Sequence, residues 1–214
     1  MKLKLTIPES LDDIKLSQCQ KFHRTTEGSE DNAFVARQMV GIFCNIPDEV
    51  VDKIKATDYN NIVQDISKVL EQEPKFKQTF KLDGVKYGFI PKLDDITVGE
   101  KADLDEYLKD IKNLDKAMAV LYRPIKSETR GTYLIEDYEG KGESLNCSLG
   151  VALGASFFLT NLTRDLLNCT LNFIEDQVAH NDKLSQILEQ SGVGINQSMH
   201  YLREISSNLT KWAS

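Results

Sequence analysis

The dipeptide Asp83-Gly84 is the sequence feature that most constrains the fold. It separates two short runs that alternate polar and apolar residues, within residues 80–87. Asp-Gly supplies the two positive-φ positions of a type I′ turn, whose twist matches that of the flanking strands. The sequence therefore predicts a β-hairpin at about 78–90. Two strands alone are marginal in water, so we expect residues 2–7, which alternate Lys with apolar residues, to add a strand, and a helix to cover one face.

Helical spacing of apolar residues dominates the region before the hairpin. It predicts helices over about 17–24 and 31–44, with Ser17 as the cap of the first, and further helices that begin near Pro47 and after Asp58. The last of these carries an apolar stripe formed by Ile62, Ile66, Val69 and Leu70.

After the hairpin, Thr97 and Glu100 have the spacing of a capping box. Helices are expected over about 104–111 and 114–122, and a short strand over 132–135. Arg123-Pro124 should end the second helix, because the residue before proline avoids the α region. We expect Arg123 to bond the last carbonyls of that helix or a carboxylate such as Asp105.

The last third of the chain has two apolar seams at helical spacing. The first, within residues 149–178, comprises Ala155, Phe158, Leu162, Leu166, Cys169 and Phe173. The second comprises Ile195, Met199, Leu202, Ile205, Leu209 and Trp212. Such seams suit helix-on-helix packing, either within one chain or with a partner. The candidate protein-interaction residues are Phe158, Leu162, Leu166, Phe173, Met199, Leu202 and Trp212.

These patterns predict a mainly helical α+β chain. A small antiparallel β-sheet packs with helices in residues 1–140, and residues 141–214 form a C-terminal helical hairpin or bundle, which either stands apart or packs as one unit with the first part. The polar, glycine-containing loop at 139–143 is the expected boundary.

The net charge of −7 does not favour nucleic-acid binding, because phosphate repels an acidic chain that lacks a segregated basic patch. The best basic stretch, 123–130, is interrupted by Glu128. The N-terminus lacks the apolar core of a secretory signal. The longest mainly apolar stretch, 149–159, is too short to span a bilayer. We expect a cytoplasmic protein, or one packaged from the cytoplasm.

The motifs of the common catalytic and cofactor sites are missing. No C-x-x-C pair joins any of the four cysteines, which are expected to be buried, reduced thiols, and no Walker or G-x-G-x-x-G sequence occurs. We therefore expect no catalytic residue, cofactor or metal. Carboxylates do cluster at Asp94, Asp95, Glu100, Asp103, Asp105 and Glu106. Helix capping and a solvated face explain them, and an enzyme whose cleft gathers Asp94, Asp95, Asp103 or Asp105 is the alternative.

Four segments resemble a family of tailed-bacteriophage proteins found in crAss-like and marine phage genomes among structural and assembly genes. They are LDGVKYGFIP at 82–91, VGEKADLDEY at 98–107, KAMAVLYRPI at 116–125 and YLIEDYEG at 133–140. The resemblance covers roughly residues 30–175, with 117–124 its most specific part. It implies a role in tail assembly or head–tail morphogenesis and carries over no catalytic residue.

The sequence as a whole predicts a non-enzymatic phage morphogenesis protein that acts by contacts with other phage proteins or with its own copies. A virion component near the head–tail junction or inside the particle is the preferred form. A tail-assembly chaperone absent from the mature virion is the first alternative, and an enzyme with an unrecognised carboxylate site is the second.

Overall fold

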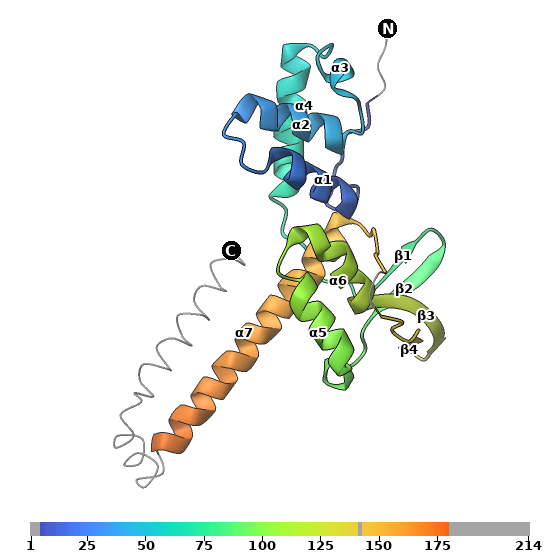
Figure 1. Ribbon diagram of the computed structural model, residues 1–214, viewed down its shortest axis with the longest axis vertical. Coiled ribbons are helices and arrows are strands. Elements are labelled where there is room, and N and C mark those ends of the chain that lie inside the picture. Colours follow the sequence, from blue (N-terminus) through green and yellow to red (C-terminus); the bar gives the residue numbers. More distant parts are fainter. Residues whose placement is uncertain (1–4, 141–142, 180–214) are drawn as a thin grey trace. The chain divides into compact units, whose positions relative to one another are not determined.

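A computed structural model describes residues 5–140 and 143–179 of the chain (Figure 1). The chain divides into two compact units, Met1–Ala155 and Ser156–Ser214. The described residues are mainly helical and contain one small antiparallel sheet, which is the α+β class that the sequence predicts. The polar loop at 139–143 does not coincide with the division between the units.

Four helices open the first unit: α1 Leu16–Thr26, α2 Asn32–Phe43, α3 Asp48–Val51 and α4 Ala56–Leu70. The side chain of Gln18 accepts a hydrogen bond from the Lys15 backbone, so α1 begins before the expected cap, Ser17. Asp31 caps α2 by accepting from the backbone of Ala33 and Phe34. The predicted apolar stripe of α4 is buried at Ile62, Ile66 and Val69.

The predicted hairpin is confirmed. It consists of β1 Thr79–Leu82 and β2 Val85–Phe89, with Leu82 opposite Val85. Asp83 and Gly84 both have positive φ, at 49° and 84°, as a type I′ turn requires.

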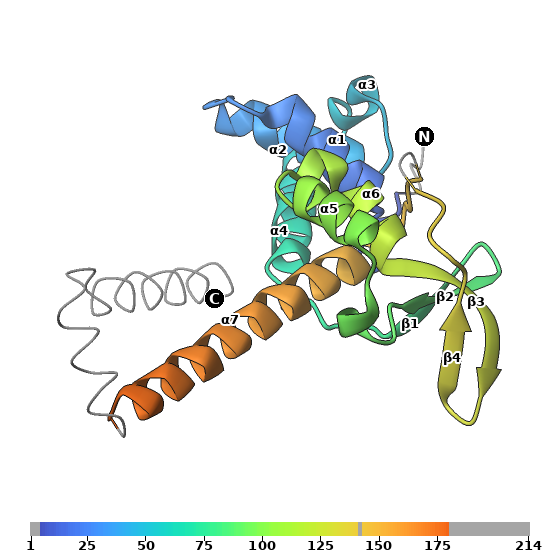
Figure 2. The same ribbon diagram turned by 60° about the horizontal axis from the view of Figure 1, so that its bottom comes forward.

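The third strand was expected from residues 2–7, but the structure builds it from a later segment of the chain. Residues 5–7 are not in a strand, and residues 2–4 lie outside the described part of the chain. The strand is β3, Tyr122–Thr129, which pairs with β2 and, after a turn at Arg130-Gly131, with β4, Thr132–Ile135. The sheet order is β1-β2-β3-β4 (Figure 2). Pro124 ends the helix before it, as predicted, but it does not prevent a strand.

Two helices lie between β2 and β3, namely α5 Val98–Tyr107 and α6 Leu114–Leu121, which pack against each other (Figure 1). The 3-10 turns η1 Leu93–Asp95 and η2 Ile111–Asn113 precede them. The expected helix over 104–111 was placed too late, because the capping box at Thr97 starts α5 at Val98. The second expected helix, over 114–122, agrees with α6, which buries most of its residues.

Aromatic side chains fix the sheet to the core. Tyr122 is almost fully buried, and its hydroxyl donates to the Lys77 carbonyl at 2.7 Å. Its ring makes edge-to-face contacts with Phe80 and Phe89, whose centroids are 5.1 and 5.2 Å away. Burial raises the pKa of the Tyr122 hydroxyl. Met118 and Leu121 of α6 are fully buried beside Tyr122 in the sequence and belong to the same core.

Backbone hydrogen bonds join residues near the beginning of the first unit to residues near its end. The backbone of Leu16 donates to the Cys147 carbonyl at 2.9 Å, and that of Leu149 donates to the Ile14 carbonyl at 2.7 Å. The Gly150 backbone donates to the Leu11 carbonyl at 3.0 Å. A Cβ on Gly154 would lie 2.4 Å from the Lys75 carbonyl oxygen, so only glycine permits this approach.

The last described element is α7, Leu149–Ala179 (Figure 1). It confirms the long helix predicted over 149–178. Its start belongs to the first unit and its remainder, from Ser156, to the second.

Gly88 provides a test of the packing between β2 and β4. A Cβ at this position would lie 2.4 Å from Cε2 of Tyr133, whose hydroxyl donates to the Phe89 carbonyl at 2.8 Å. We expect Gly88→Ala to lower the free energy of unfolding by about 1–3 kcal/mol, because the Tyr133 ring that must give way is buried and held by its hydrogen bond. Urea unfolding followed by circular dichroism measures this. Gly99→Ala is the matched control, since a Cβ there meets only Thr97 Oγ1 at 4.0 Å. Equal stability of both variants would contradict the packing.

Candidate functional site

The predicted interaction residues on α7 differ in how much they are exposed. Phe158 and Leu162 are partly exposed, whereas Leu166 and Phe173 have 61% and 63% of their surface open to solvent. The remaining three, Met199, Leu202 and Trp212, lie outside the described residues.

The apolar seam of α7 is a continuous heptad stripe. Counted from Ala152 it steps by 3 and 4 residues in turn, and it comprises Ala152, Ala155, Leu159, Leu162, Leu166, Cys169 and Phe173. Ala152 and Ala155 are completely buried, while the same stripe is open at Leu166 and Phe173. We call Leu159, Leu162, Leu166, Cys169 and Phe173 the distal seam. Leu159 was missed as an interaction residue because the 3-4 spacing was counted through Phe158.

The four cysteines also differ in how much they are exposed to solvent. Cys44 and Cys147 are buried, as expected, and burial raises their thiol pKa values to about 11 and about 12. Cys19 is partly exposed. Cys169 is exposed, which corrects the expectation that all four are buried. Cys169 is exposed because it belongs to the distal seam, which is open to solvent at Leu166 and Phe173.

A buried ion pair joins α5 to β3. Arg123 Nη2 lies 2.9 Å from Glu100 Oε1, and the two side chains are only 10% and 5% exposed. The other oxygen of Glu100 accepts from the Thr97 backbone at 2.7 Å, which completes the capping box. The predicted partner of Arg123 was either the last carbonyls of the helix or a carboxylate such as Asp105. Asp105 was the wrong carboxylate, because it lies on the solvent side of α5, where it binds Lys101 at 3.2 Å.

The acidic residues between 94 and 106 do not form a common cleft. Asp94, Asp95 and Asp105 are exposed, whereas Asp103 is buried. The hydroxyl of Tyr138 donates to Asp103 Oδ2 at 2.7 Å. Burial, followed by this bond to a carboxylate, raises the pKa of Tyr138. The arrangement in which Asp94, Asp95, Asp103 or Asp105 meet as catalytic carboxylates is therefore not present in the described structure.

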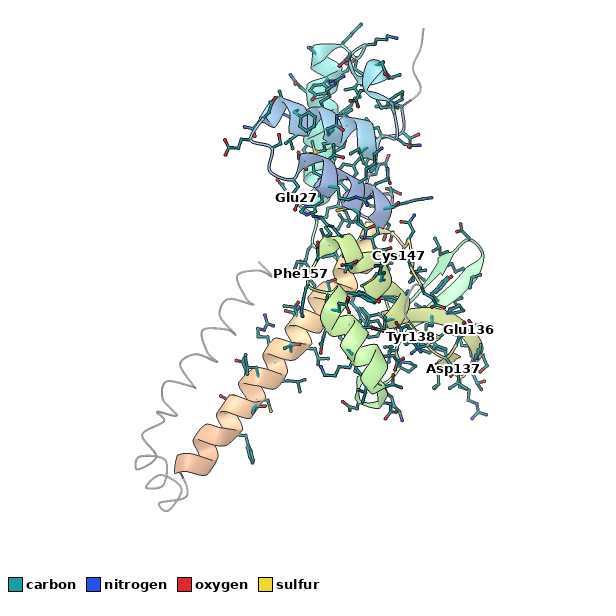
Figure 3. All side chains as sticks on the ribbon, in the orientation of Figure 1. Glu27, Glu136, Asp137, Tyr138, Cys147 and Phe157 are labelled. Atoms are coloured by element: carbon teal, nitrogen blue, oxygen red, sulfur yellow. The ribbon has the colours of Figure 1, made fainter. Side chains whose placement is uncertain are left out.

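A second acidic group, not singled out from the sequence, lines a surface hollow of about 290 Å³. Its carboxylates belong to the exposed residues Glu136, Asp137, Glu139 and Glu143. Glu136 and Asp137 are labelled in Figure 3. Lys126 Nζ donates to Asp137 at 2.9 Å and lowers the pKa of that carboxyl. Because these side chains are solvated, the hollow is an open acidic surface and lacks the desolvation that tunes a catalytic acid.

The basic stretch at 123–130 does not form one positive face. Arg123 is buried against Glu100, and Lys126 is paired with Asp137. The guanidinium of Arg123 is thus already engaged within the fold and does not face an external phosphate.

Neither a metal site nor a membrane-spanning helix is found among the described residues, 5–140 and 143–179. No group of three or more His, Cys, Asp or Glu side chains is placed to hold a metal ion. No helix among these residues combines the length and apolar character that crossing a membrane requires.

Comparison with known protein families, curated proteins and solved structures finds no match to this chain.

The buried pair is testable by a double-mutant cycle. Arg123→Met leaves the Glu100 carboxylate buried without its cation, so we expect a loss of about 3–5 kcal/mol in the free energy of unfolding. Adding Glu100→Gln removes that buried charge and keeps a cap acceptor, so the double variant should be more stable than Arg123→Met alone. Urea unfolding measures all three variants. Asp105→Asn, which breaks the exposed pair with Lys101, should cost less than about 1 kcal/mol. Additive costs at Glu100 and Arg123 would contradict the coupling.

Thiol reactivity tests the placement of the cysteines. In native protein at pH 8, a thiol reagent should modify Cys169 first, because it is exposed, while Cys44 and Cys147 remain protonated and covered. Unfolding in urea should make all four react at similar rates. Peptide mass spectrometry identifies the modified positions, and early modification of Cys147 would show that the junction of the two ends of the first unit opens.

Proposed function

We propose that this protein is a non-enzymatic phage morphogenesis protein whose work is done by protein–protein contacts of the helical unit that begins at Ser156. The preferred form is a structural component of the virion, near the head–tail junction or inside the particle. The resemblance of residues 30–175 to a tailed-phage family supports the phage assignment, and the distal seam supports the mode of action.

The observation that carries the proposal is the change of exposure along one stripe of α7. The stripe is completely buried at Ala155 and more than half exposed at Leu166 and Phe173. An apolar helix face of this kind costs free energy in water and is stabilised by a second helix that packs into it. Proteins that assemble by helix-in-groove or coiled-coil contacts need such a face.

The carboxylates give an enzymatic reading less support. Glu100 and Asp103, the buried acids of α5, are held by Arg123 and Tyr138, respectively. The Glu100 ion pair holds β3 against α5, and the Asp103 hydrogen bond holds the segment after β4 against the same helix. An assembly chaperone that leaves the finished particle remains the alternative within the same class, because it would use the same seam transiently.

Mass spectrometry on purified phage particles tests the proposal. We expect the protein at a fixed ratio to the major capsid protein, because a structural component occupies a set number of equivalent sites. Abundance in infected cells together with absence from particles would contradict a virion role and favour the chaperone.

A pair of matched variants connects this outcome to the seam. Leu166→Asp with Phe173→Asp places charge on the distal seam and should reduce incorporation into particles by tenfold or more, since burying an unpaired carboxylate costs several kcal/mol (about 1.4 kcal/mol for each factor of ten). Asn168→Asp with Asn172→Asp adds the same charge at exposed positions outside the stripe and should leave incorporation unchanged. Equal incorporation of both would contradict the use of the seam.

A further inference from the structure

A second surface hollow, of about 390 Å³, is basic, although the chain as a whole carries a net charge of −7. It lies in the first unit, between strand β1 and the segment that leads into α7. Cys147, labelled in Figure 3, is one of its lining residues. Three of the lining side chains are positive and one is negative, namely Lys15, Lys77, Lys81 and Asp12. We call this place the basic hollow.

The aspartate of the basic hollow is already compensated within the fold. Asp12 pairs with Lys77 through one oxygen and accepts from the Ser148 hydroxyl at 3.0 Å through the other. Lys15 and Lys81 are exposed, and neither forms an ion pair within residues 5–140 and 143–179. Two positive charges of the hollow therefore face solvent without a carboxylate of the described chain beside them, which favours an anionic group at this place.

Strand β1, which lines the basic hollow, is an edge strand of the sheet. Leu82 flanks the type I′ turn and so belongs to a hydrogen-bonded pair, and pairs with and without bonds alternate from there along the hairpin. The Phe89 N–H donates to the Gln78 carbonyl at 2.9 Å, as this alternation requires. Thr79 and Lys81 belong to the pairs without bonds, so their backbone N–H and C=O groups point away from β2. No backbone bond in the described part of the chain occupies these groups, and they are available to a further strand.

We propose that the basic hollow and the outer edge of β1 together bind an extended acidic segment of a partner protein. The segment adds to the sheet as a strand beside β1, with its main chain bonded to Thr79 and Lys81. Main-chain bonds of this kind supply affinity, and the places for alternate side chains supply specificity. Because every second side chain of a strand points to the same side, carboxylates at alternate positions lie on one face of the added strand and meet the lysines of the hollow.

Two other occupants fit this surface less well. Pairing of two β1 strands from separate copies brings Lys81 of one copy to the basic hollow of the other, and like charges across a strand pair destabilise it. Nucleic acid supplies negative charge but has no peptide groups to continue the sheet, and the acidic chain repels it. An acidic peptide segment is the occupant that uses both the charge and the strand edge.

Binding of a synthetic peptide to the full chain tests the proposal. The probe is a short fluorescent peptide in which Glu alternates with Val, and fluorescence anisotropy measures its Kd. We expect saturable binding that weakens as the salt concentration rises. The same peptide with alternate amides N-methylated keeps its charge but cannot continue the sheet, so its Kd should be about tenfold higher. A single-stranded oligothymidylate of similar charge should also bind about tenfold more weakly.

Variants of the protein separate the charge from the strand edge. Lys15→Glu with Lys81→Glu reverses the two free charges and should raise the Kd by about tenfold or more. Lys53→Glu with Lys109→Glu makes the same change in net charge at exposed lysines outside the hollow and should leave the Kd within about twofold. Thr79→Pro removes an outward N–H that β2 does not use, so the hairpin should persist, as circular dichroism checks, while the Kd rises by about tenfold.

Four results would overturn the proposal. The first is absence of saturable binding of the Glu-Val peptide to the wild-type chain. The second is an equal loss of binding in both double-lysine variants, which assigns the effect to net charge alone. The third is unchanged binding of the N-methylated peptide, which means that the hollow binds anions without extending the sheet. The fourth is equal or tighter binding of the oligothymidylate, which assigns the surface to nucleic acid. None of these results involves the distal seam or phage particles, so this inference goes beyond the proposed function and fails or holds separately from it.

Discussion

Glu100 uses its two carboxylate oxygens for two separate tasks in the core of the first unit. One oxygen accepts from the Thr97 backbone and fixes the start of α5, and the other binds Arg123 on β3. The start of the helix and the start of the strand are thereby held by one side chain. Because both charges are nearly removed from water, neither can be lost alone without leaving the other unpaired. The packing of α5, α6 and the sheet depends on this arrangement.

Local sequence patterns predicted some elements correctly, but they did not predict those that depend on contacts between distant residues. Local signals were sufficient for the hairpin at Asp83-Gly84, for the cap at Thr97 and for the long helix α7, because each depends on residues within a few positions of one another. β3 was missed because Arg123-Pro124 indicates only where a helix ends. Its strand conformation depends on pairing with Gly88 and Phe89, far away in the sequence. The choice of Glu100 over Asp105 also depends on which side of α5 faces β3, and spacing alone does not establish that side.

For the candidate interaction surface, the sequence was sufficient for the residues but not for their exposure. Heptad spacing places Leu162, Leu166 and Phe173 on one side of α7, and this holds for any environment of the helix. Whether the side is covered depends on where the first unit ends. The structure places that limit at Ala155, after which the stripe becomes progressively more open. The residues of this surface thus follow from local heptad spacing, whereas their exposure depends on where the first unit ends.

The junction between residues 11–16 and 147–150 has a consequence for the order of events during synthesis. The backbone of Leu16, at the first turn of α1, is bonded to Cys147, and Ile14 is bonded to Leu149. On the ribosome, α1 and α2 emerge long before these partners exist, so the N-terminal helices wait with part of their apolar surface uncovered. The first unit closes only when residue 150 has left the exit tunnel. The distal seam follows directly behind that point in the sequence, so its apolar side chains leave the ribosome only once the partners that close the first unit are present.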